Sequence, residues 1–154
     1  MANARGCLIN RRPVVCFMAV RLTRKVDFPM VDMAGIAFYP RIYDLAHRFF
    51  EGFWEEACGV DYPTILSEYR VGFPVVDIKS TFHAPLRYGD TVNATIWISA
   101  VGNKSCTWQY RFNNQNGELI WSSEQVTACV SMDSMESMTI PGVLRTGLEA
   151  CGNE

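Results

Sequence analysis

One long apolar segment constrains the fold of this chain more than any other feature of its sequence. Between Pro40 and Gly59, large apolar residues recur at steps of three and four, the period of an amphipathic helix. These residues are Ile42, Leu45, Ala46, Phe49, Phe50, Phe53 and Trp54. Pro40 suits the first turn of a helix and Gly59 suits the left-handed residue that ends one. We therefore expect a helix that starts near Tyr39 or Pro40 and is wrapped by other elements.

Alternation of apolar and polar residues, the period of a half-buried strand, surrounds this helix. The expected strands cover residues 20–28, 76–83, 91–100, 106–112 and 118–132. The apolar phase of the last strand shifts between Trp121 and Val126, which predicts a β-bulge around residues 122–124. Hairpin-type turns join the later strands, so we expect antiparallel pairing. The segment through Pro63 is expected to be a loop.

The order of these elements predicts an α+β domain, in which a curved antiparallel sheet of about five strands wraps one long helix. The chain of 154 residues is of the usual size for one domain, without an internal repeat or a linker. We assign residues 18–135 to the domain. Residues 1–17 precede Met18, and we expect them to be an N-terminal extension outside the fold. The chain from Asp133 onward looks loosely attached, and residues 136–154 form a C-terminal tail.

Composition disfavours several classes of function. The net charge of -2 and the absence of a long basic run argue against nucleic acid as a partner. The apolar stretch over residues 13–20 runs into Arg21 and is too short to span a membrane. The six cysteines are scattered, and only His47 and His83 could join them as ligands. This pattern argues against a metal site or a disulfide framework and favours a reduced, cytoplasmic setting.

The start of the helix resembles a known family. Residues 26–50 read VDFPMVDMAGIAFYPRIYDLAHRFF, and the pattern that opens 4-hydroxybenzoyl-CoA thioesterase-like proteins is matched by Asp32, Gly35, Phe38, Tyr39 and Pro40. A looser similarity covers about residues 20–135, through RVGFPVVDIKSTFHAPLRYGD and GNKS. The resemblance implies a hotdog fold and hydrolysis of an aryl or fatty acyl-CoA thioester without a cofactor. It also implies a homodimer or homotetramer with shared active sites.

The residues before the helix suit this chemistry. Thioester hydrolysis needs a nucleophile or general base near the carbonyl carbon, and donors aimed at the carbonyl oxygen. In the resemblance Asp32 supplies the carboxylate, after which Gly35 turns the chain, and the backbone N–H groups near Tyr39 polarise the carbonyl. By position alone, an aspartate before a helix is more often a cap or turn residue. Whether Asp32 attacks the carbonyl or activates water is open.

Two further sets of residues are candidates for binding substrate. Phe38 and Phe73 suit an acyl or aryl pocket, although aromatic residues near a helix are usually part of the core. Lys104 and Ser105, with Arg87, suit the phosphates of coenzyme A, because cations and hydroxyls at surface turns bind anions without a burial cost. A solvated turn lysine explains Lys104 equally well.

Two other functions stay open at this point. A hotdog dehydratase or hydratase would act on a 3-hydroxyacyl or enoyl thioester and generally needs a helical histidine with an acid. His47 is the candidate for that role, although a lone helical histidine is more often a packed or interface residue. The other alternative is a non-catalytic acyl-binding module or a cystatin-like binding module. The sequence does not set the acyl group, the pathway, or dimer against tetramer.

Overall fold

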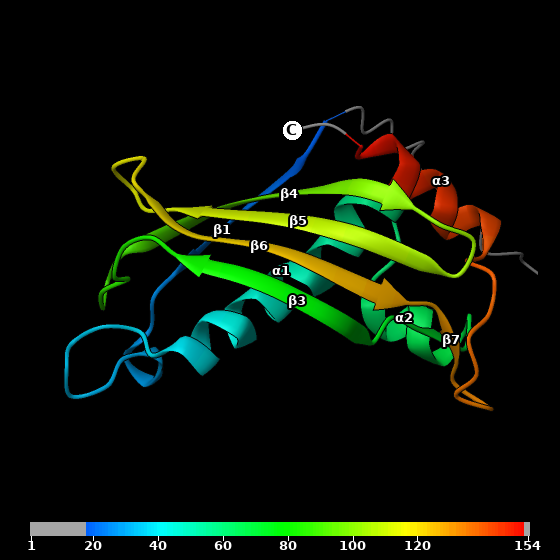
Figure 1. Cartoon of the computed structure of the whole chain (residues 1–154), viewed down its shortest axis with the longest axis horizontal. Coiled ribbons are helices and arrows are strands. Elements are labelled where there is room, and N and C mark those ends of the chain that lie inside the picture. Colours follow the sequence, from blue (N-terminus) through cyan, green and yellow to red (C-terminus); the bar gives the residue numbers. More distant parts are fainter. Residues whose placement is uncertain (1–17, 153–154) are drawn as a thin grey trace, which may run out of the picture.

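One antiparallel sheet wraps one long helix (Figure 1). The structure is a computed structural model that describes residues 18–152, so the extension expected over residues 1–17 lies outside the described residues. The five strands of the sheet are β1 (Val20–Lys25), β3 (Val75–Phe82), β4 (Thr91–Val101), β5 (Ser105–Asn113) and β6 (Leu119–Ala128). Their order is β1-β4-β5-β6-β3, and every neighbouring pair is antiparallel. The predicted α+β architecture is confirmed.

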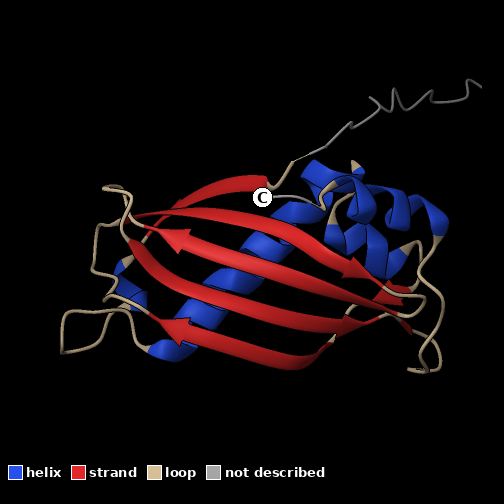
Figure 2. Ribbon diagram, turned by 45° about the horizontal axis from the view of Figure 1, so that its top comes forward, coloured by secondary structure: helices blue, strands red, loops and turns tan. Residues whose placement is uncertain are grey.

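Helix α1 (Tyr39–Cys58) has the predicted limits and the predicted buried face. Gly59 ends it with φ of 65°, the left-handed value that glycine adopts without strain. All seven apolar residues of the expected face are buried. They pack on the inner side of β5, where the Phe53 and Phe50 rings lie 4.9 and 5.0 Å from the Trp108 ring and the Phe49 ring lies 5.2 Å from Phe112. Figure 2 shows the helix lying across the concave face of the sheet.

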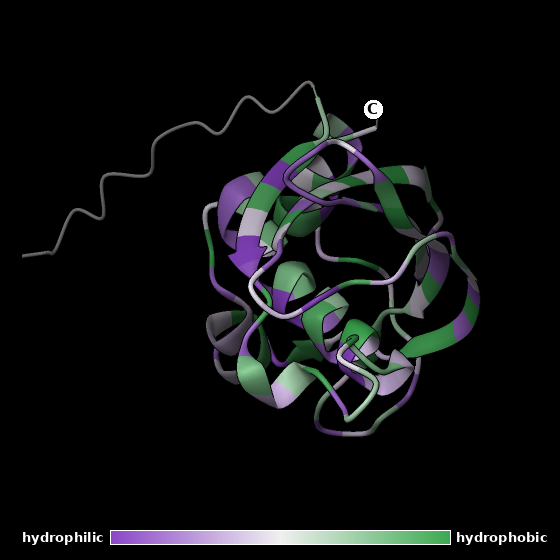
Figure 3. Ribbon diagram, turned by 90° about the vertical axis from the view of Figure 1, so that its left-hand side faces the viewer, coloured by the Kyte–Doolittle hydropathy of each residue, from purple (hydrophilic) through white to green (hydrophobic). Residues whose placement is uncertain are grey.

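Alternation along the strands follows the predicted period. In β5 the inward residues Cys106, Trp108, Tyr110 and Phe112 are buried. Viewed from the end of the molecule, hydrophobic and hydrophilic positions alternate along the strands that surround the helix (Figure 3). The core therefore lies between α1 and the concave face of the sheet.

The first strand is shorter than expected. β1 ends at Lys25 and is followed by a one-turn 3₁₀ helix, η1 (Phe28–Met30). Pro29 fixes φ and has no N–H to give to a strand, so the chain leaves the sheet before it. Phe28 is 73% exposed, so its assignment to the inner face of the strand was wrong.

The prediction of a β-bulge around residues 122–124 of β6 is also wrong. Trp121, Ser123, Gln125 and Thr127 all face inward, without a change of phase. The register against β5 shifts earlier, because Phe112 pairs with Trp121 and Asn113 with Leu119. The sequence predicted a bulge because three of the inward residues, Ser123, Gln125 and Thr127, are polar. The outward Val126 was therefore assigned to the apolar face.

Two short elements were not predicted. The segment through Pro63 forms helix α2 (Tyr62–Ser67), where the Asp61 carboxylate accepts a hydrogen bond of 2.8 Å from the Thr64 N–H. Next, β2 (Val71–Gly72) pairs with β7 (Val130–Ser131), so the strand expected over residues 118–132 ends at Ala128 and its last part belongs to a second sheet. Elements of two to six residues are too short to show a period in the sequence.

The C-terminal segment is not a loose tail. Helix α3 (Gly142–Ala150) packs on α1 and β4, with Leu144, Leu148 and Cys151 fully buried. A Cβ atom on Gly147 would lie 2.7 Å from the Ala57 carbonyl oxygen, so the two helices approach as closely as glycine allows. The expectation of a loosely attached tail was therefore wrong. Within residues 18–152, no helix combines the length and apolarity that a membrane crossing needs.

Replacing Leu148 by Ala tests whether α3 belongs to the core. Leu148 has no exposed surface, so we expect a loss of about 2–5 kcal/mol in the free energy of unfolding. Val143 lies on the same helix and is 45% exposed, so Val143→Ala is the matched control and should change this free energy by less than about 0.5 kcal/mol. Denaturant unfolding measures both variants. Equal small effects would mean that α3 is not docked in solution.

Candidate active site

Asp32 lies in a tight loop between η1 and α1. The Asp32 N–H donates to the Ile36 carbonyl at 3.2 Å, and the Gly35 N–H donates to the Asp32 carbonyl at 3.0 Å. Gly35 has φ of 75°, which other residues adopt only with strain. The Asp32 Oδ1 atom accepts a bond of 2.8 Å from the Ala34 N–H. Among the described residues nothing donates to Oδ2, so one oxygen of this exposed carboxylate is available for chemistry.

A neighbouring turn supports the loop. The Ala37 N–H donates to the Leu86 carbonyl at 2.7 Å, and Ile36 forms a bridge with Arg87. The turn is held by Asp90, whose carboxylate accepts bonds from the Arg87 N–H at 2.8 Å and from Gln115 at 2.9 Å. Of the three residues expected to bind phosphate, Arg87 is thus the one that the fold places beside the Asp32 loop.

The N-terminus of α1 begins directly after this loop. Phe38 is the N-cap residue, and its side chain makes no capping hydrogen bond. Pro40 has no N–H, and the Arg41 N–H donates to the Phe38 carbonyl at 2.9 Å. In the part of the chain that the structure describes, the Tyr39 N–H has no acceptor. A free backbone donor at the positive end of a helix therefore lies at the same end of the molecule as Asp32.

The two aromatic residues proposed for an acyl pocket lie far apart in one chain. Phe38 is partly exposed, with the Arg41 guanidinium 5.8 Å from its ring. Phe73 is buried against Trp54, with ring centroids 4.6 Å apart. Trp54 follows Tyr39 by fifteen residues, which is roughly 22 Å along a helix. The two phenylalanines therefore do not line one pocket within a single chain.

Lys104 and Ser105 lie at the other end of the sheet from Asp32. Lys104 is in the turn between β4 and β5, where its Nζ atom donates to the Ser137 carbonyl at 3.4 Å, and Ser105 is the first residue of β5. Arg87 precedes the start of β4. Because β4 has 11 residues and a strand rises about 3.3 Å per residue, its two ends are roughly 30 Å apart. Arg87 and Lys104 therefore cannot meet at one phosphate within a single chain.

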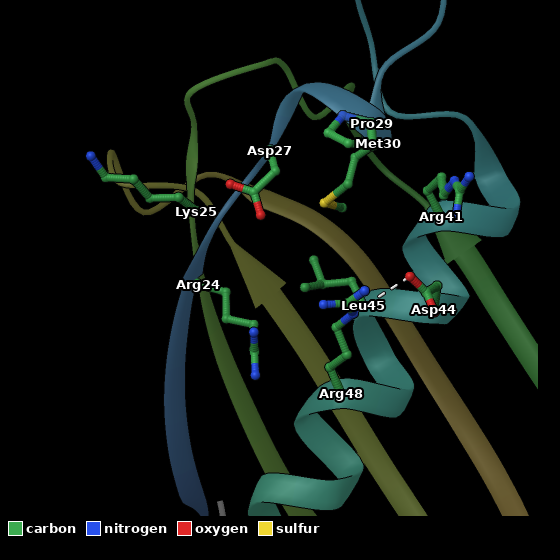
Figure 4. Close-up of a pocket in the computed structure, with 9 residues that line it drawn as sticks. All are labelled: Arg24, Lys25, Asp27, Pro29, Met30, Arg41, Asp44, Leu45 and Arg48. Atoms are coloured by element: carbon green, nitrogen blue, oxygen red, sulfur yellow. Dashed lines mark ion pairs between the residues drawn. The ribbon is translucent and has the colours of Figure 1, made fainter.

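Two cavities flank α1. The basic cavity, of about 90 Å³, lies between β1 and the first turns of α1. It is lined by Arg24, Lys25, Asp27, Pro29, Met30, Arg41, Asp44, Leu45 and Arg48. Arg24 reaches from β1 toward Arg48 on α1, and Arg48 pairs with Asp44 at 3.5 Å (Figure 4). The sequence did not reveal this cavity, because its cations come from two elements that only the fold brings together.

The α1–β3 cavity lies on the opposite flank of the helix and is larger, at about 310 Å³. It is lined by Tyr43, His47, Phe50, Tyr62, Phe73, Pro74, Val75, Ile78, Tyr110 and Gln125. Phe73 was expected in such a pocket. The sequence analysis did not propose Tyr110 or Gln125 as pocket residues. For Gln125 there was a signal, because it is a polar residue at an inward position of β6.

The middle of the chain matches a family model. Residues 34–120, more than half of the chain, match the model of the thioesterase superfamily. The match begins two residues after Asp32 and includes Gly35 and Tyr39. A 1,4-dihydroxy-2-naphthoyl-CoA hydrolase from Prochlorococcus marinus (strain NATL2A) is 28% identical over 112 residues, which are 66% of this chain and 69% of that protein.

Solved structures have the same fold. A gentisyl-coenzyme A thioesterase superposes with a TM-score of 0.73 and 28% identity, covering 82% of this chain and 99% of that one. A 1,4-dihydroxy-2-naphthoyl-CoA thioesterase from Synechocystis superposes with a TM-score of 0.76 and 17% identity, covering 84% and 95%. These likenesses confirm the hotdog fold. With the sheet, the wrapped helix and the family match in agreement, this chain belongs to the thioesterase superfamily.

Proposed function

We propose that this protein hydrolyses the thioester bond of an acyl-CoA to a free acid and coenzyme A, with Asp32 as the catalytic carboxylate. One observation carries the assignment of the site. The Asp32 carboxylate is fixed on a supported loop, the Tyr39 N–H begins a long helix directly after it, and residues 18–152 leave one carboxylate oxygen and this N–H without a hydrogen-bond partner. This pairing supplies both parts that acyl transfer needs, a base or nucleophile and an oxyanion donor.

In this mechanism the thioester carbonyl oxygen accepts a hydrogen bond from the Tyr39 N–H. Charge builds up on that oxygen as the carbonyl carbon is attacked, and the helix dipole stabilises it. Two routes are compatible with the loop. In one, Asp32 attacks the carbon and expels the coenzyme A thiolate, and water then hydrolyses the mixed anhydride. In the other, Asp32 takes a proton from the water that attacks. Neither route needs a metal or a cofactor.

We propose an aromatic acyl group rather than a fatty one. The relatives named above act on 1,4-dihydroxy-2-naphthoyl-CoA and gentisyl-coenzyme A, both of which carry hydroxylated rings. The volume of the α1–β3 cavity is at the lower end of the range for small-molecule pockets, and aromatic side chains line it. An aromatic ring matches such walls better than a flexible chain does.

We propose that the active enzyme is a homodimer or a homotetramer built from such dimers. Strand β3 is at the edge of the sheet, and its Val76, Ile78 and Phe82 side chains are exposed. Antiparallel pairing with β3 of a second copy would cover this edge. It would also bring the Lys104 turn of one copy toward the Asp32 loop of the other, so Lys104 and Ser105 would bind coenzyme A phosphates across the interface.

The alternative functions have less support. His47 lies eight residues beyond Tyr39, roughly 12 Å along the helix, and pairs with Glu51 at 3.4 Å on a largely exposed face. A hydratase would need that pair close to the polarised carbonyl. A binding module would have no use for a carboxylate with a free oxygen beside a helix N-terminus. Cys58, Cys106 and Cys129 are thiols outside any disulfide, in keeping with the cytoplasmic setting that we propose for the enzyme.

Replacing Asp32 by Asn tests the catalytic assignment. Turnover of an aroyl-CoA should fall by at least about a hundredfold, because the amide is neither a base nor a nucleophile. The loop should persist, since the amide oxygen can still accept from the Ala34 N–H. Thiol release measures turnover, and thermal unfolding checks the fold. Asp27→Asn, an exposed carboxylate near the same loop, is the control and should keep its activity. Near wild-type turnover in Asp32→Asn would show that Asp32 is not the catalytic carboxylate.

The role of the Tyr39 backbone can be separated from that of its ring. Proline is tolerated at the first position of a helix, so Tyr39→Pro removes the N–H while keeping the helix start. We expect kcat to fall about a hundredfold to a thousandfold, the usual effect of losing an oxyanion donor. Tyr39→Phe keeps the N–H and should stay within about twofold of wild type. Equal kcat values for the two variants would show that the Tyr39 N–H is not the oxyanion donor.

Mixing two variants tests whether Lys104 acts across the interface. Lys104→Ala alone should raise KM for an aroyl-CoA severalfold at unchanged kcat, since an exposed charge contact contributes about 1 kcal/mol. With a large excess of Asp32→Asn subunits, each Lys104→Ala subunit pairs with a partner that supplies an intact Lys104. KM should then return to the wild-type value. A raised KM in the mixture, or a monomer by light scattering, would contradict the shared site.

A further inference from the structure

Two buried polar side chains that line the α1–β3 cavity are poorly satisfied by the described residues. Most of the cavity wall is apolar or aromatic, but Gln125 on β6 and Tyr110 on β5 also line it. They are 7% and 2% exposed. In the register of the two strands Tyr110 pairs with Ser123, two residues from Gln125. The two side chains are therefore diagonal neighbours on the inner face of the sheet.

The Gln125 amide is poorly satisfied by the protein. Its Nε2 atom lies 3.5 Å from the Ser123 Oγ atom, a long contact for a hydrogen bond, and its carbonyl oxygen accepts none among residues 18–152. Ser123 itself is occupied, because its hydroxyl donates to the Lys79 carbonyl at 3.0 Å and accepts from Ser80 at 3.0 Å. Leaving a buried amide in this state is unfavourable unless another group binds it.

The Tyr110 hydroxyl is in a similar position. It has no hydrogen-bond partner among the described residues. Burial raises the pKa of Tyr110 far above its usual value, so the hydroxyl stays protonated and can donate. Among the other buried polar groups of this core, the Trp108 indole donates to Thr127 at 2.9 Å, whereas the Trp54 and Trp121 Nε1 atoms have no partner among the described residues. The Tyr62 hydroxyl, also on the cavity wall, accepts from the Phe73 N–H at 3.2 Å.

We propose that Gln125 and Tyr110 recognise a hydroxyl substituent on the acyl group of the substrate. A ring hydroxyl can donate to the Gln125 carbonyl oxygen and accept from the Tyr110 hydroxyl, so one substituent satisfies both groups. The ring itself would enter the cavity beside Tyr43, which lies four residues, roughly 6 Å along the helix, from Tyr39. This inference rests on the proposed thioesterase function and makes Gln125 and Tyr110 determinants of specificity rather than of catalysis.

An unsubstituted ring would leave both groups unpaired in a desolvated cavity. Sites built to bind a substrate hydroxyl reject analogues without it, because the unpaired groups then cost free energy. The cavity is partly open, so we expect a preference of about tenfold to a hundredfold in kcat/KM. The preference should depend on the position of the hydroxyl on the ring, since the two groups are fixed on the sheet.

The test compares hydroxylated and unsubstituted thioesters on three variants. The probes are benzoyl-CoA, its three monohydroxy derivatives, 2-naphthoyl-CoA and 1-hydroxy-2-naphthoyl-CoA. Wild type should prefer at least one hydroxylated probe over its parent by tenfold or more. Gln125→Leu should reduce that preference about tenfold, mainly by losing activity on the hydroxylated probe. Tyr110→Phe removes a single oxygen and should act in the same direction, which keeps the test valid if Gln125→Leu does not fold.

Gln109→Leu is the matched control. Gln109 lies on β5 with its side chain on the outer face of the sheet, where it donates to Glu124 at 2.8 Å. Its replacement should leave the preference unchanged. A wild-type enzyme that hydrolyses these probes without preference for a hydroxyl would overturn the inference, as would an unchanged preference in both cavity variants.

A binding measurement separates this inference from the proposed function. Calorimetry on Asp32→Asn protein gives the affinity for the same probes without turnover, alone and combined with Gln125→Leu or Tyr110→Phe. If wild type hydrolyses none of the probes, the proposed hydrolysis of these thioesters is contradicted. The role of Gln125 and Tyr110 is then still tested by whether the protein binds hydroxylated probes more tightly than their parents. Equal affinity for hydroxylated and parent probes would overturn it.

Discussion

The packing of α1 on the inner face of β5 is the contact on which the rest of the structure depends. Phe50 and Phe53 hold Trp108 between the helix and the sheet, and each is almost fully buried. Burying a side chain of this size stabilises a fold by about 1.5–3 kcal/mol, so the cluster fixes where the helix lies. Its free N-terminus then emerges beside the Asp32 loop, at the end where β4 begins. Core packing thereby sets the geometry of the candidate site.

The candidate residues divide between the two ends of the sheet, and this division has a consequence for assembly. Asp32, Tyr39 and Arg87 gather at one end, whereas Lys104 and Ser105 lie at the other. A two-fold pairing of β3 edges reverses one copy relative to the other, so opposite ends become neighbours. The exposed apolar side chains of β3 and the separation within one chain thus favour the same arrangement. A single subunit would hold the reacting groups without the phosphate contacts.

The sequence predicted the features that repeat or that form a motif. The α1 limits, five strands and the Asp32 to Pro40 pattern were readable because period and turn residues act locally. The docking of α3 was missed, since Leu144 and Leu148 gain their burial only from α1 and β4. The polar face of β6 was misread because inward polar residues such as Gln125 break the rule that inward means apolar. Such exceptions are expected where a cavity serves a ligand.

The proposed mechanism requires a thioester carbonyl to bind between the Asp32 carboxylate and the Tyr39 N–H. A crystal structure of the wild-type protein with an aroyl-CoA analogue, in which a methylene group replaces the thioester sulfur, tests it most directly. We expect a carbonyl oxygen about 2.7–3.1 Å from the Tyr39 nitrogen, with the carbonyl carbon facing Asp32. A carbonyl bound in the basic cavity, or anywhere out of reach of both groups, would contradict it.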